Sequence, residues 1–367
     1  MRSTIAATVS LVVIAAAGAG CSNAETLVFE EMRKIDVHVH FFDDLPELTD
    51  MLRRNNMRVV NICLYGTRPE FLEPGHIRAV YLQETYAPQF FFASTFDLTQ
   101  RNEPDYAEQV IAWLDRTFED GALMVKLWKD AGMEITTPDG EFILPDDPIF
   151  DPIYSHIARR GKPLMMHVAD PIEAWRPLDP NSFHYNYYRN NPEWHVYDRE
   201  GFPSHEELMA ARDNVLAKHP DLVVLGAHFG SMTHDLDALA ERFERFPNFH
   251  VDVSARTPLL FSKPTQEVRE FFITYQDRVL YGTDASQFSI LGQPPEEQRI
   301  AFAENMERSY RSDFQYYAGQ GTATFGRREV ECLALPREVV EKFFYKNAQR
   351  LMPGLATAGT GPQTADE

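Results

Sequence analysis

Near its amino end the chain reads Lys34-Ile35-Asp36-Val37-His38-Val39-His40-Phe41, an apolar run in which two histidines stand two positions apart. Side chains two apart on a β-strand point to the same side. The spacing therefore predicts a strand whose valines face covering helices and whose histidines face inward. Two neighbouring imidazoles can bind one metal ion. An isolated pair of this kind is more often solvent-facing, so the rest of the chain has to decide.

Short apolar runs rich in Val, Ile, Leu and Phe recur along the chain, as expected for buried parallel strands. They span residues 34–41, 59–65, 90–98, 122–128, 163–168, 222–229, 249–254 and 279–284. Amphipathic segments lie between them, at 105–119, 151–160, 204–218 and 235–246. Eight strand–helix alternations predict an α/β fold of the (β/α)8 TIM barrel type rather than an open sheet. We expect one domain over residues 26–353.

The first residues have a different character. Arg2 is followed by an uncharged run from Ile5 to Gly20, which predicts a secretory signal over residues 1–21. The run ends in Gly18-Ala19-Gly20-Cys21, which resembles a bacterial lipobox, with Gly18 where Leu is usual. We expect an exported protein, either periplasmic or held in the cell envelope by a lipid on Cys21. Only two further cysteines remain, which is too few for a disulfide framework.

The charge balance narrows the partners. The formal net charge is −20 and the pI about 5.0. Nucleic acid and anionic membrane surfaces would repel such a chain, so neither is expected as a partner. A lipid anchor would be the only link to a membrane. A small-molecule substrate is the expected ligand.

Two segments interrupt the alternation. Residues 170–203 are long for a connection and rich in Trp, Tyr and Phe, so we expect a lid over the barrel mouth. The alternative is a hydrophobic plug. Residues 336–351 predict a closing helix, and residues 354–367, small and polar, predict a disordered tail.

Three apolar runs end in a polar residue of the kind that binds metals. His167 ends the fifth run, His228 the sixth, and Asp284 the eighth. A polar side chain at the end of a buried strand is costly without a partner. Barrel enzymes keep their active sites at these carboxyl ends. We therefore expect the three residues to join His38 and His40 in one metal site.

With these five residues in place, the chain resembles the amidohydrolase superfamily, and in particular its amidohydrolase-2 branch, over residues 34–351. The resemblance implies that His38, His40, His167 and Asp284 bind a metal, Zn²⁺ by expectation. It implies that His228 is a second-metal ligand or polarises the substrate carbonyl. Asp284 would also take a proton from the attacking water and pass it to the leaving group.

Lys126 governs the number of metal ions. Relatives with two metals carry a carboxylated lysine on the fourth strand, in a similar Lys-Leu-aromatic context. If Lys126 faces inward, Lys129 faces outward. Burial beside cations would lower its pKa and allow it to react with CO₂. The alternative is an ammonium group that binds a substrate carboxylate, and both remain open.

Weaker candidates lie around this core. Arg256, just past the seventh run, is expected to reach a substrate anion or else to form a surface ion pair. Arg176 and Tyr185 in the aromatic stretch are expected to contact substrate. Asp36 would point inward below His38 and orient a ligand.

The leading function is hydrolysis of an amide, lactone or ester-like bond in a small molecule. The alternative within the same family branch is non-oxidative decarboxylation of an aromatic or unsaturated acid, which a free Lys126 would leave open. An exported binding protein is a third option, although it would not need Asp284. The resemblance also implies a homodimer contact through the aromatic stretch.

Overall fold

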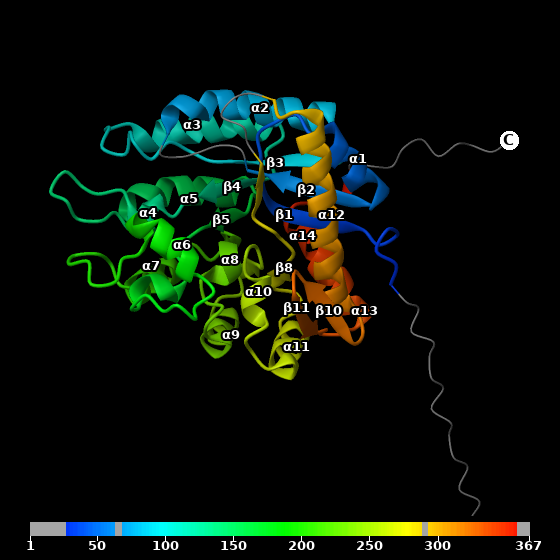
Figure 1. The fold of residues 1–367 in the computed structure, drawn as a ribbon. Helices are drawn as coiled ribbons and strands as arrows, with labels where there is room; N and C mark the ends of the chain where they lie inside the picture. The colour runs from blue at the N-terminus through cyan, green and yellow to red at the C-terminus, as the bar shows by residue number, and fades with distance from the viewer. Residues whose placement is uncertain (1–26, 63–67, 288–292, 358–367) are drawn as a thin grey trace, which may run out of the picture.

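A parallel sheet forms the centre of the computed structural model, which describes residues 27–62, 68–287 and 293–357 (Figure 1). Its order is β8-β7-β6-β5-β4-β3-β2-β1-β9, so strands that follow one another in sequence also lie side by side. The strands are β1 (Lys34–Phe41), β2 (Met57–Asn61), β3 (Phe90–Ser94), β4 (Met124–Leu127), β5 (Leu164–Met166), β6 (Val224–Gly226), β7 (Phe249–Asp252), β8 (Val279–Leu280) and β9 (Ala285–Gln287). Seven of the eight predicted runs contain the matching strand, and the second run, 59–65, overlaps β2, which begins two residues earlier.

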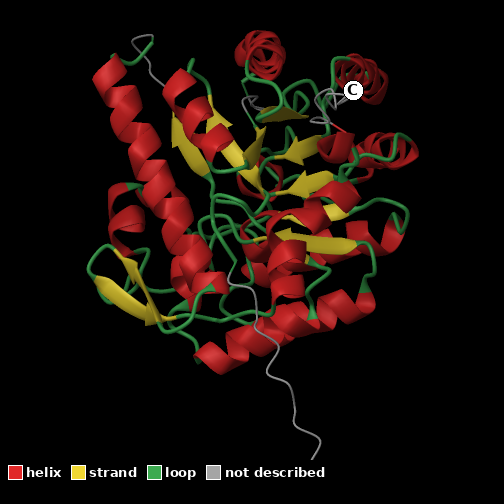
Figure 2. Cartoon of the chain, turned by 90° about the vertical axis from the view of Figure 1, so that its right-hand side faces the viewer, coloured by secondary structure: helices red, strands yellow, loops and turns green. Residues whose placement is uncertain are grey.

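Helices connect successive strands and lie outside them (Figure 2). They are α1 (Pro46–Arg54), α2 (Leu72–Thr85), α3 (Tyr106–Glu119), α4 (Asp130–Met133), α5 (Asp151–Arg159), α6 (Tyr185–Asn190), α7 (His205–Lys218), α8 (Ala227–Gly230), α9 (Leu236–Arg245), α10 (Thr257–Leu260), α11 (Thr265–Thr274), α12 (Glu296–Ala318), α13 (Arg337–Glu341), α14 (Asn347–Leu351) and α15 (Gly354–Thr357). A π-helical turn, Lys342–Lys346, joins α13 to α14, so the predicted closing helix is one helical stretch.

The four predicted amphipathic helices match α3, α5, α7 and α9 within one residue at each end. Local chemistry sets the start of α7, where Ser204 Oγ accepts a hydrogen bond from Glu207 N (3.1 Å) and the Glu207 carboxylate accepts one from Ser204 N (2.8 Å). The long helix α12 and the antiparallel hairpin β10 (Thr322–Phe325) and β11 (Arg328–Glu331) were not predicted. The apolar residues of α12 gather only weakly on one face of the helix, and charged residues occur along its whole length.

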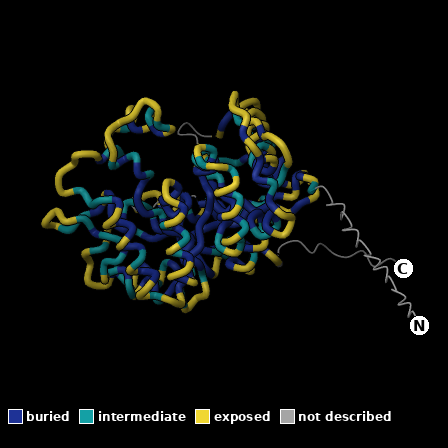
Figure 3. The backbone as a smooth tube through the Cα atoms, turned by 90° about the horizontal axis from the view of Figure 1, so that it is seen from below, coloured by how far each residue is buried: buried dark blue, intermediate teal, exposed yellow. Residues whose placement is uncertain are grey.

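The central strands are buried and the outer segments are exposed (Figure 3). The alternating side chains of the strands form two clusters, of which one lies on the inner face of the sheet and holds Val60, Met124, Met165, Leu225 and Leu280. Their sequence neighbours belong to the cluster between strands and helices, among them Val59, Val125, Leu164, Val224 and Val279. Met124 and Met165 of the first cluster lie two positions before Lys126 and His167, so the side chains of these two candidate site residues face the same side.

The alternation in β1 differs from the prediction. The register with β2 runs from Asp36↔Val59 to Val39↔Asn61, so β1 contains one extra residue. Val37 packs in the inner cluster and only Val39 faces the helices. The prediction that both valines point outward is therefore wrong for Val37. The extra residue turns the strand so that His38 and His40 both face inward.

The predicted place of Asp36 is also wrong. Its carboxylate accepts hydrogen bonds from Tyr310 OH on α12 (3.0 Å) and from Thr283 Oγ1 (2.6 Å), on the helix side of β1. It also accepts the backbone N–H of His38 (3.0 Å) and of Thr283 (3.1 Å). Burial raises the pKa of Asp36 to about 7. Asp36 therefore holds two backbone segments together and does not touch an imidazole.

The last strands run beside the first. Only residues 281–284 separate β8 from β9, and β9 pairs with β1 at Val39↔Ala285. Val37 N donates to Tyr281 O (3.1 Å), and Asp284 N donates to His38 O (2.8 Å). These bonds hold Asp284 next to the two histidines of β1.

The aromatic stretch 170–203 has a small core of its own, in which Ala174, Tyr188 and Val196 are buried against Trp175 and Trp194. The predicted signal, residues 1–21, and most of the predicted tail lie outside the described residues. Among the described residues, no helix is long and apolar enough to cross a membrane.

Candidate metal centre

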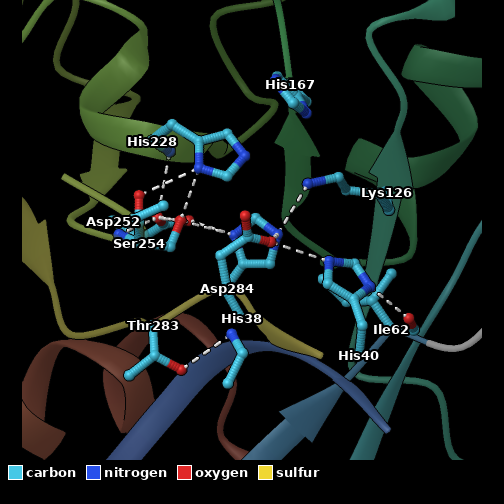
Figure 4. Close-up of polar contacts among 12 residues, drawn as sticks. His38, His40, Ile62, Lys126, His167, His228, Asp252, Ser254, Thr283 and Asp284 are labelled. Atoms are coloured by element: carbon cyan, nitrogen blue, oxygen red, sulfur yellow. Dashed lines mark hydrogen bonds and ion pairs between the residues drawn. The ribbon is translucent and has the colours of Figure 1, made fainter. Parts of the chain in front are cut away.

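Three side chains converge at the carboxyl end of the sheet. Asp284 Oδ1 lies 3.1 Å from His40 Nε2 and 3.5 Å from His38 Nε2 (Figure 4). One ligand atom from each of the three lies within 4.8 Å of the others. The histidines come from β1 and the carboxylate from the connection between β8 and β9. This is the group that the sequence predicted as the core of a metal site.

The ring orientation of each histidine is fixed from its far side. His40 Nδ1 lies 2.7 Å from Ile62 O, and His228 Nδ1 lies 3.0 Å from Ser254 O. A carbonyl oxygen only accepts, so both Nδ1 atoms carry the proton and both Nε2 atoms keep a lone pair. His38 Nδ1 lies 3.2 Å from Asp252 Oδ2, with the same consequence. Metal-binding histidines are commonly held in this way.

Asp252 and Ser254 form a shared support beneath two of the imidazoles, and the sequence prediction missed both. Ser254 Oγ lies 2.9 Å from His38 Nδ1 and 3.1 Å from His228 Nδ1. Asp252 Oδ1 accepts from the backbone N–H of Ser254 (2.9 Å) and of His228 (3.2 Å). Burial would raise the pKa of Asp252, but His38 holds it well below its usual range. Ser254 ends the predicted run 249–254, and Asp252 lies two positions before it on the same side of the strand, which is the signal that could have found both.

His167 and His228 complete the group on the side of β5 and β6. Their ring centroids are 4.3 Å apart, and His228 is 4.9 Å from His38. His167 Nε2 is buried without a hydrogen bond in the described part of the chain, and it stands 3.8 Å from Asp170 Oδ1. Burial holds the pKa of His167 well below its usual value, and neighbouring positive groups lower it further. The imidazole therefore stays neutral, as a metal ligand must be.

Lys126 faces inward, with its Nζ 3.1 Å from His38 Nε2 and 3.4 Å from Met165 Sδ. Burial lowers the pKa of Lys126 to about 8. Lys129, three residues on, binds both oxygens of Asp170 at 3.0 Å, and Asp170 Oδ1 stands 3.8 Å from His167 Nε2. Lys129 therefore lies beside the group, and the prediction that it faces outward is wrong.

The backbone is strained where it delivers these side chains. His228 and Asp284 have φ of 58° and 63°, values that residues other than glycine rarely adopt. Such strain is held only where the surrounding structure determines it, and it gathers at functional sites. Gly282 is needed for a different reason. A Cβ there would stand 3.2 Å from His38 Cβ and 3.4 Å from Ser254 Cβ.

The carboxylate at the centre is ionised. Burial would raise the pKa of Asp284, but His228, His40 and His38 together hold it well below its usual range. A half-buried carboxylate beside imidazoles whose Nε2 atoms keep a lone pair is a donor set that fits a divalent cation such as zinc. The orphaned Nε2 of His167 supports the same fit.

The three candidate substrate residues divide between two adjoining cavities. Arg256 is buried and lines a cavity of about 280 Å³. Arg176 and Tyr185 line a second cavity of about 610 Å³, which the aromatic stretch covers. Glu173, Leu259 and Ser262 line both. Burial lowers the pKa of Arg256, while the negative charges of Asp170 and Asp284 oppose that effect. Arg256 is therefore close enough to Asp284, a candidate metal ligand, for the two charges to interact.

Comparison with known proteins places the chain. The family model described as Amidohydrolase matches residues 35–353. A search of curated proteins gives no significant match. The 2,6-dihydroxybenzoate decarboxylase from Rhizobium superposes with a TM-score of 0.50 at 15% identity, over 88% of this chain and 99% of that one.

Two further solved structures cover the chain to a similar extent. A probable 2-pyrone-4,6-dicarboxylic acid hydrolase from Acinetobacter baumannii gives a TM-score of 0.49 at 12% identity, over 88% of this chain and 100% of that one. A 5-carboxyvanillate decarboxylase from Novosphingobium aromaticivorans, solved with bound manganese, gives 0.45 at 13%, over 89% and 99%. Both hydrolases and decarboxylases are thus among the similar structures.

Proposed function

We propose, from the premise that this chain belongs to the amidohydrolase family, that it hydrolyses an amide, lactone or ester-like bond of a small molecule. Membership already makes the protein a metal-dependent enzyme. One observation carries the choice of site: the donor atoms of His38, His40 and Asp284 lie within 4.8 Å of one another. The same observation argues against a pure binding protein, which would not need a half-buried carboxylate at that point.

The proposed ligands extend beyond these three. His167 and His228 would complete the donor set, and Zn²⁺ is the proposed ion because the donors are imidazoles and one carboxylate. The Nδ1 proton of His228 is committed to Ser254 O. Its Nε2 is thus an acceptor, which favours a role as ligand over a role as hydrogen-bond donor to the substrate carbonyl.

Lys126 is proposed to react with CO₂ as a neutral amine, so that the working enzyme carries an anionic carbamate at this position that holds a second cation. Its Nζ lies 3.1 Å from His38 Nε2, the atom that would bind the first cation. An ammonium group at that distance would repel the ion. The lowered pKa supplies the free amine that reacts with CO₂.

In the reaction, a bound divalent cation would lower the pKa of a water molecule toward about 7. Asp284 would accept the proton of that water on its carboxylate and later return it to the leaving group. His40 and His38 keep Asp284 ionised and ready for this task. Arg256 would hold an anionic part of the substrate, and Arg176 and Tyr185 would contact the substrate in the second cavity.

The remaining features of the proposal concern the whole chain. The hydrogen bonds between β1 and residues 281–284 support a sheet closed as a (β/α)8 barrel. The sequence of residues 1–21 supports export to the periplasm, or attachment to the envelope through a lipid on Cys21. A homodimer through the aromatic stretch is part of the same proposal.

Metal analysis of the full chain, purified without chelators, tests the proposal together with a screen of small esters, lactones and amides. We expect bound zinc, hydrolysis that chelation abolishes, and recovery when zinc is returned. His40→Asn should lose both metal and activity, whereas His219→Gln, which only breaks an ion pair with Asp151, should keep both. Protein without metal under these conditions would overturn the assignment.

Decarboxylation of an aromatic or unsaturated acid is the second candidate, because a 2,6-dihydroxybenzoate decarboxylase shares the fold. The state of Lys126 separates the two reactions. One bound cation, a free Lys126 and release of CO₂ from aromatic acids would replace hydrolysis by decarboxylation.

A further inference from the structure

A cavity of about 280 Å³ lies beside the candidate metal centre, between the loops that follow β5, β6 and β7. This volume is at the lower end of what ligand pockets have, and it suits one small polar group with a few attached atoms. Among the polar and charged residues that line its wall are Glu173, Ser231, Thr233, His234, Arg256 and Lys263. Arg256 belongs to this wall and also lies in the field of Asp284, so it links the cavity to the metal ligands.

Two buried groups of the wall lack their usual partners. Arg256 is 7% exposed, yet its guanidinium donates one side-chain hydrogen bond among the described residues, to Ala255 O at 3.2 Å, and forms no ion pair there. Thr233 is 5% exposed, and its Oγ1 has no hydrogen-bond partner in the same part of the chain. A buried polar group without a partner is unfavourable, because it has lost its hydrogen bonds to water. A ligand with acceptor oxygens would remove that cost.

The cavity wall has more positive than negative side chains, whereas the whole chain is negatively charged. The whole sequence has a net charge of −20, whereas Arg256 and Lys263 face a single acid, Glu173. The carboxylate of Glu173 is engaged at 3.6 Å by His184 Nδ1. Lys263 Nζ donates to His234 O at 3.1 Å, which keeps it at the cavity. Burial lowers the pKa of His234; Arg176 and Lys263 add to this effect, and Asp235 and Glu173 oppose it.

We propose that this cavity binds an anionic, oxygen-rich group of the substrate, a carboxylate or a phosphate, at a distance from the bond that is hydrolysed. This inference rests on the proposed hydrolase function and names its substrate class: small amides, lactones or esters with a second, anionic end. Arg256 offers two parallel donors to such a group, Lys263 a point charge, and Thr233 a hydroxyl. A ligand without acceptor oxygens would leave most donors of the Arg256 guanidinium without a hydrogen-bond partner among the described residues.

Binding of inorganic phosphate and of acetate to the full chain, measured by calorimetry, tests the site without any turnover. The measurement is made on chelator-treated and on zinc-loaded protein, because an anion can also bind zinc. We expect binding in both states. Thr233→Val should weaken it about fivefold and Arg256→Gln more than tenfold, whereas Arg308→Gln, on the exposed face of α12, should leave it unchanged. The stronger of the two anions identifies the group.

Binding that needs zinc and ignores Thr233→Val would mean that the anion sits on the metal, and it would overturn the proposal. So would equal affinity in wild type and Arg256→Gln. Paired substrates then separate the two proposals. An ester with a carboxylate or phosphate tail should exceed its neutral analogue at least tenfold in kcat/KM, with the ratio reduced in Thr233→Val. Equal turnover of both esters overturns the anion site alone, and no hydrolysis with intact anion binding overturns the hydrolase alone.

Discussion

Asp252 Oδ2, on β7, lies 3.2 Å from Nδ1 of His38, on β1, across the inside of the sheet. The contact holds the His38 proton on Nδ1 and leaves Nε2 free for a metal ion. The contact connects β7, which carries none of the proposed metal ligands, to β1, which carries His38 and His40.

Asp252→Asn should weaken zinc binding by about ten- to a hundredfold, the usual cost of losing a group that orients a ligand. A titration against a coloured chelator measures the affinity. Ser254→Ala, which removes only the hydroxyl near His38 and His228, should cost less. The matched control is Asp313→Asn, whose carboxylate accepts from Tyr281 OH at 2.8 Å, away from the ligands. Unchanged zinc affinity in Asp252→Asn would contradict the role given to this contact.

Gly282→Ala should damage the site more than the fold. The added methyl would meet Cβ atoms of His38 and Ser254, which are fixed to the backbone and cannot turn away. Overpacking of this kind costs about 1–3 kcal/mol of stability, and displacement of a ligand lowers kcat by about tenfold or more. Gly354→Ala is the control, because its methyl would meet only the flexible end of Leu123. Equal kinetics of the two variants would show that His38 tolerates the methyl.

Lys126→Met should reduce the metal content of the purified protein from two ions to one. Intact wild-type protein analysed under native conditions with dissolved CO₂ should carry the added mass of one CO₂, and the variant should not. Lys162→Met is the control. Lys162 is only half-buried, its Nζ donates to Ala122 O at 2.7 Å, and its replacement should change neither result. A wild type with one metal and an unmodified Lys126 would exclude the bridging carbamate.

Lys34 should make stability depend on pH above neutrality. Its buried Nζ donates to Phe29 O and Met32 O, and burial lowers its pKa from 10.5 to about 7. Between these values the unfolded chain binds more protons, so the free energy of unfolding rises with pH, by at most about 1.4 kcal/mol per pH unit. Below pH 7 both states are protonated and the cost is constant. Denaturant unfolding from pH 7 to 10 should show this slope in wild type and lose it in Lys34→Met; equal slopes would refute the assignment.

The sequence was informative for residues whose position at the end of a single strand is enough to indicate where the side chain lies. Lys126 and His167 each lie two positions after an inner-facing methionine, so the rule of alternation placed their side chains correctly. His228 and Asp284 lie past the strand ends at positive φ, where alternation no longer places a side chain. The same rule failed in β1, because a single extra residue reverses the alternation and sequence does not mark where it occurs. Val37 and Asp36 were misplaced for that reason.

Other features depend on contacts between distant segments. The partner of Asp36 is Tyr310, 274 positions away on a helix that was not predicted. Ser254 and His38 are 216 positions apart. Such pairs follow from how the strands line up, which only the folded chain determines. The two cavities likewise arise from loops whose lengths and aromatic content were visible, but whose packing was not.

The separate core of the aromatic stretch has a consequence for descent. Because Ala174, Tyr188 and Val196 pack mainly against members of their own segment, mutations there can accumulate without disturbing the strands that carry the metal ligands. Selection could therefore retune which compound is accepted while the chemical machinery stays intact. A lineage built this way would diversify by exchanging one insertion, and relatives with the same five ligands would be expected to differ most between residues 170 and 203.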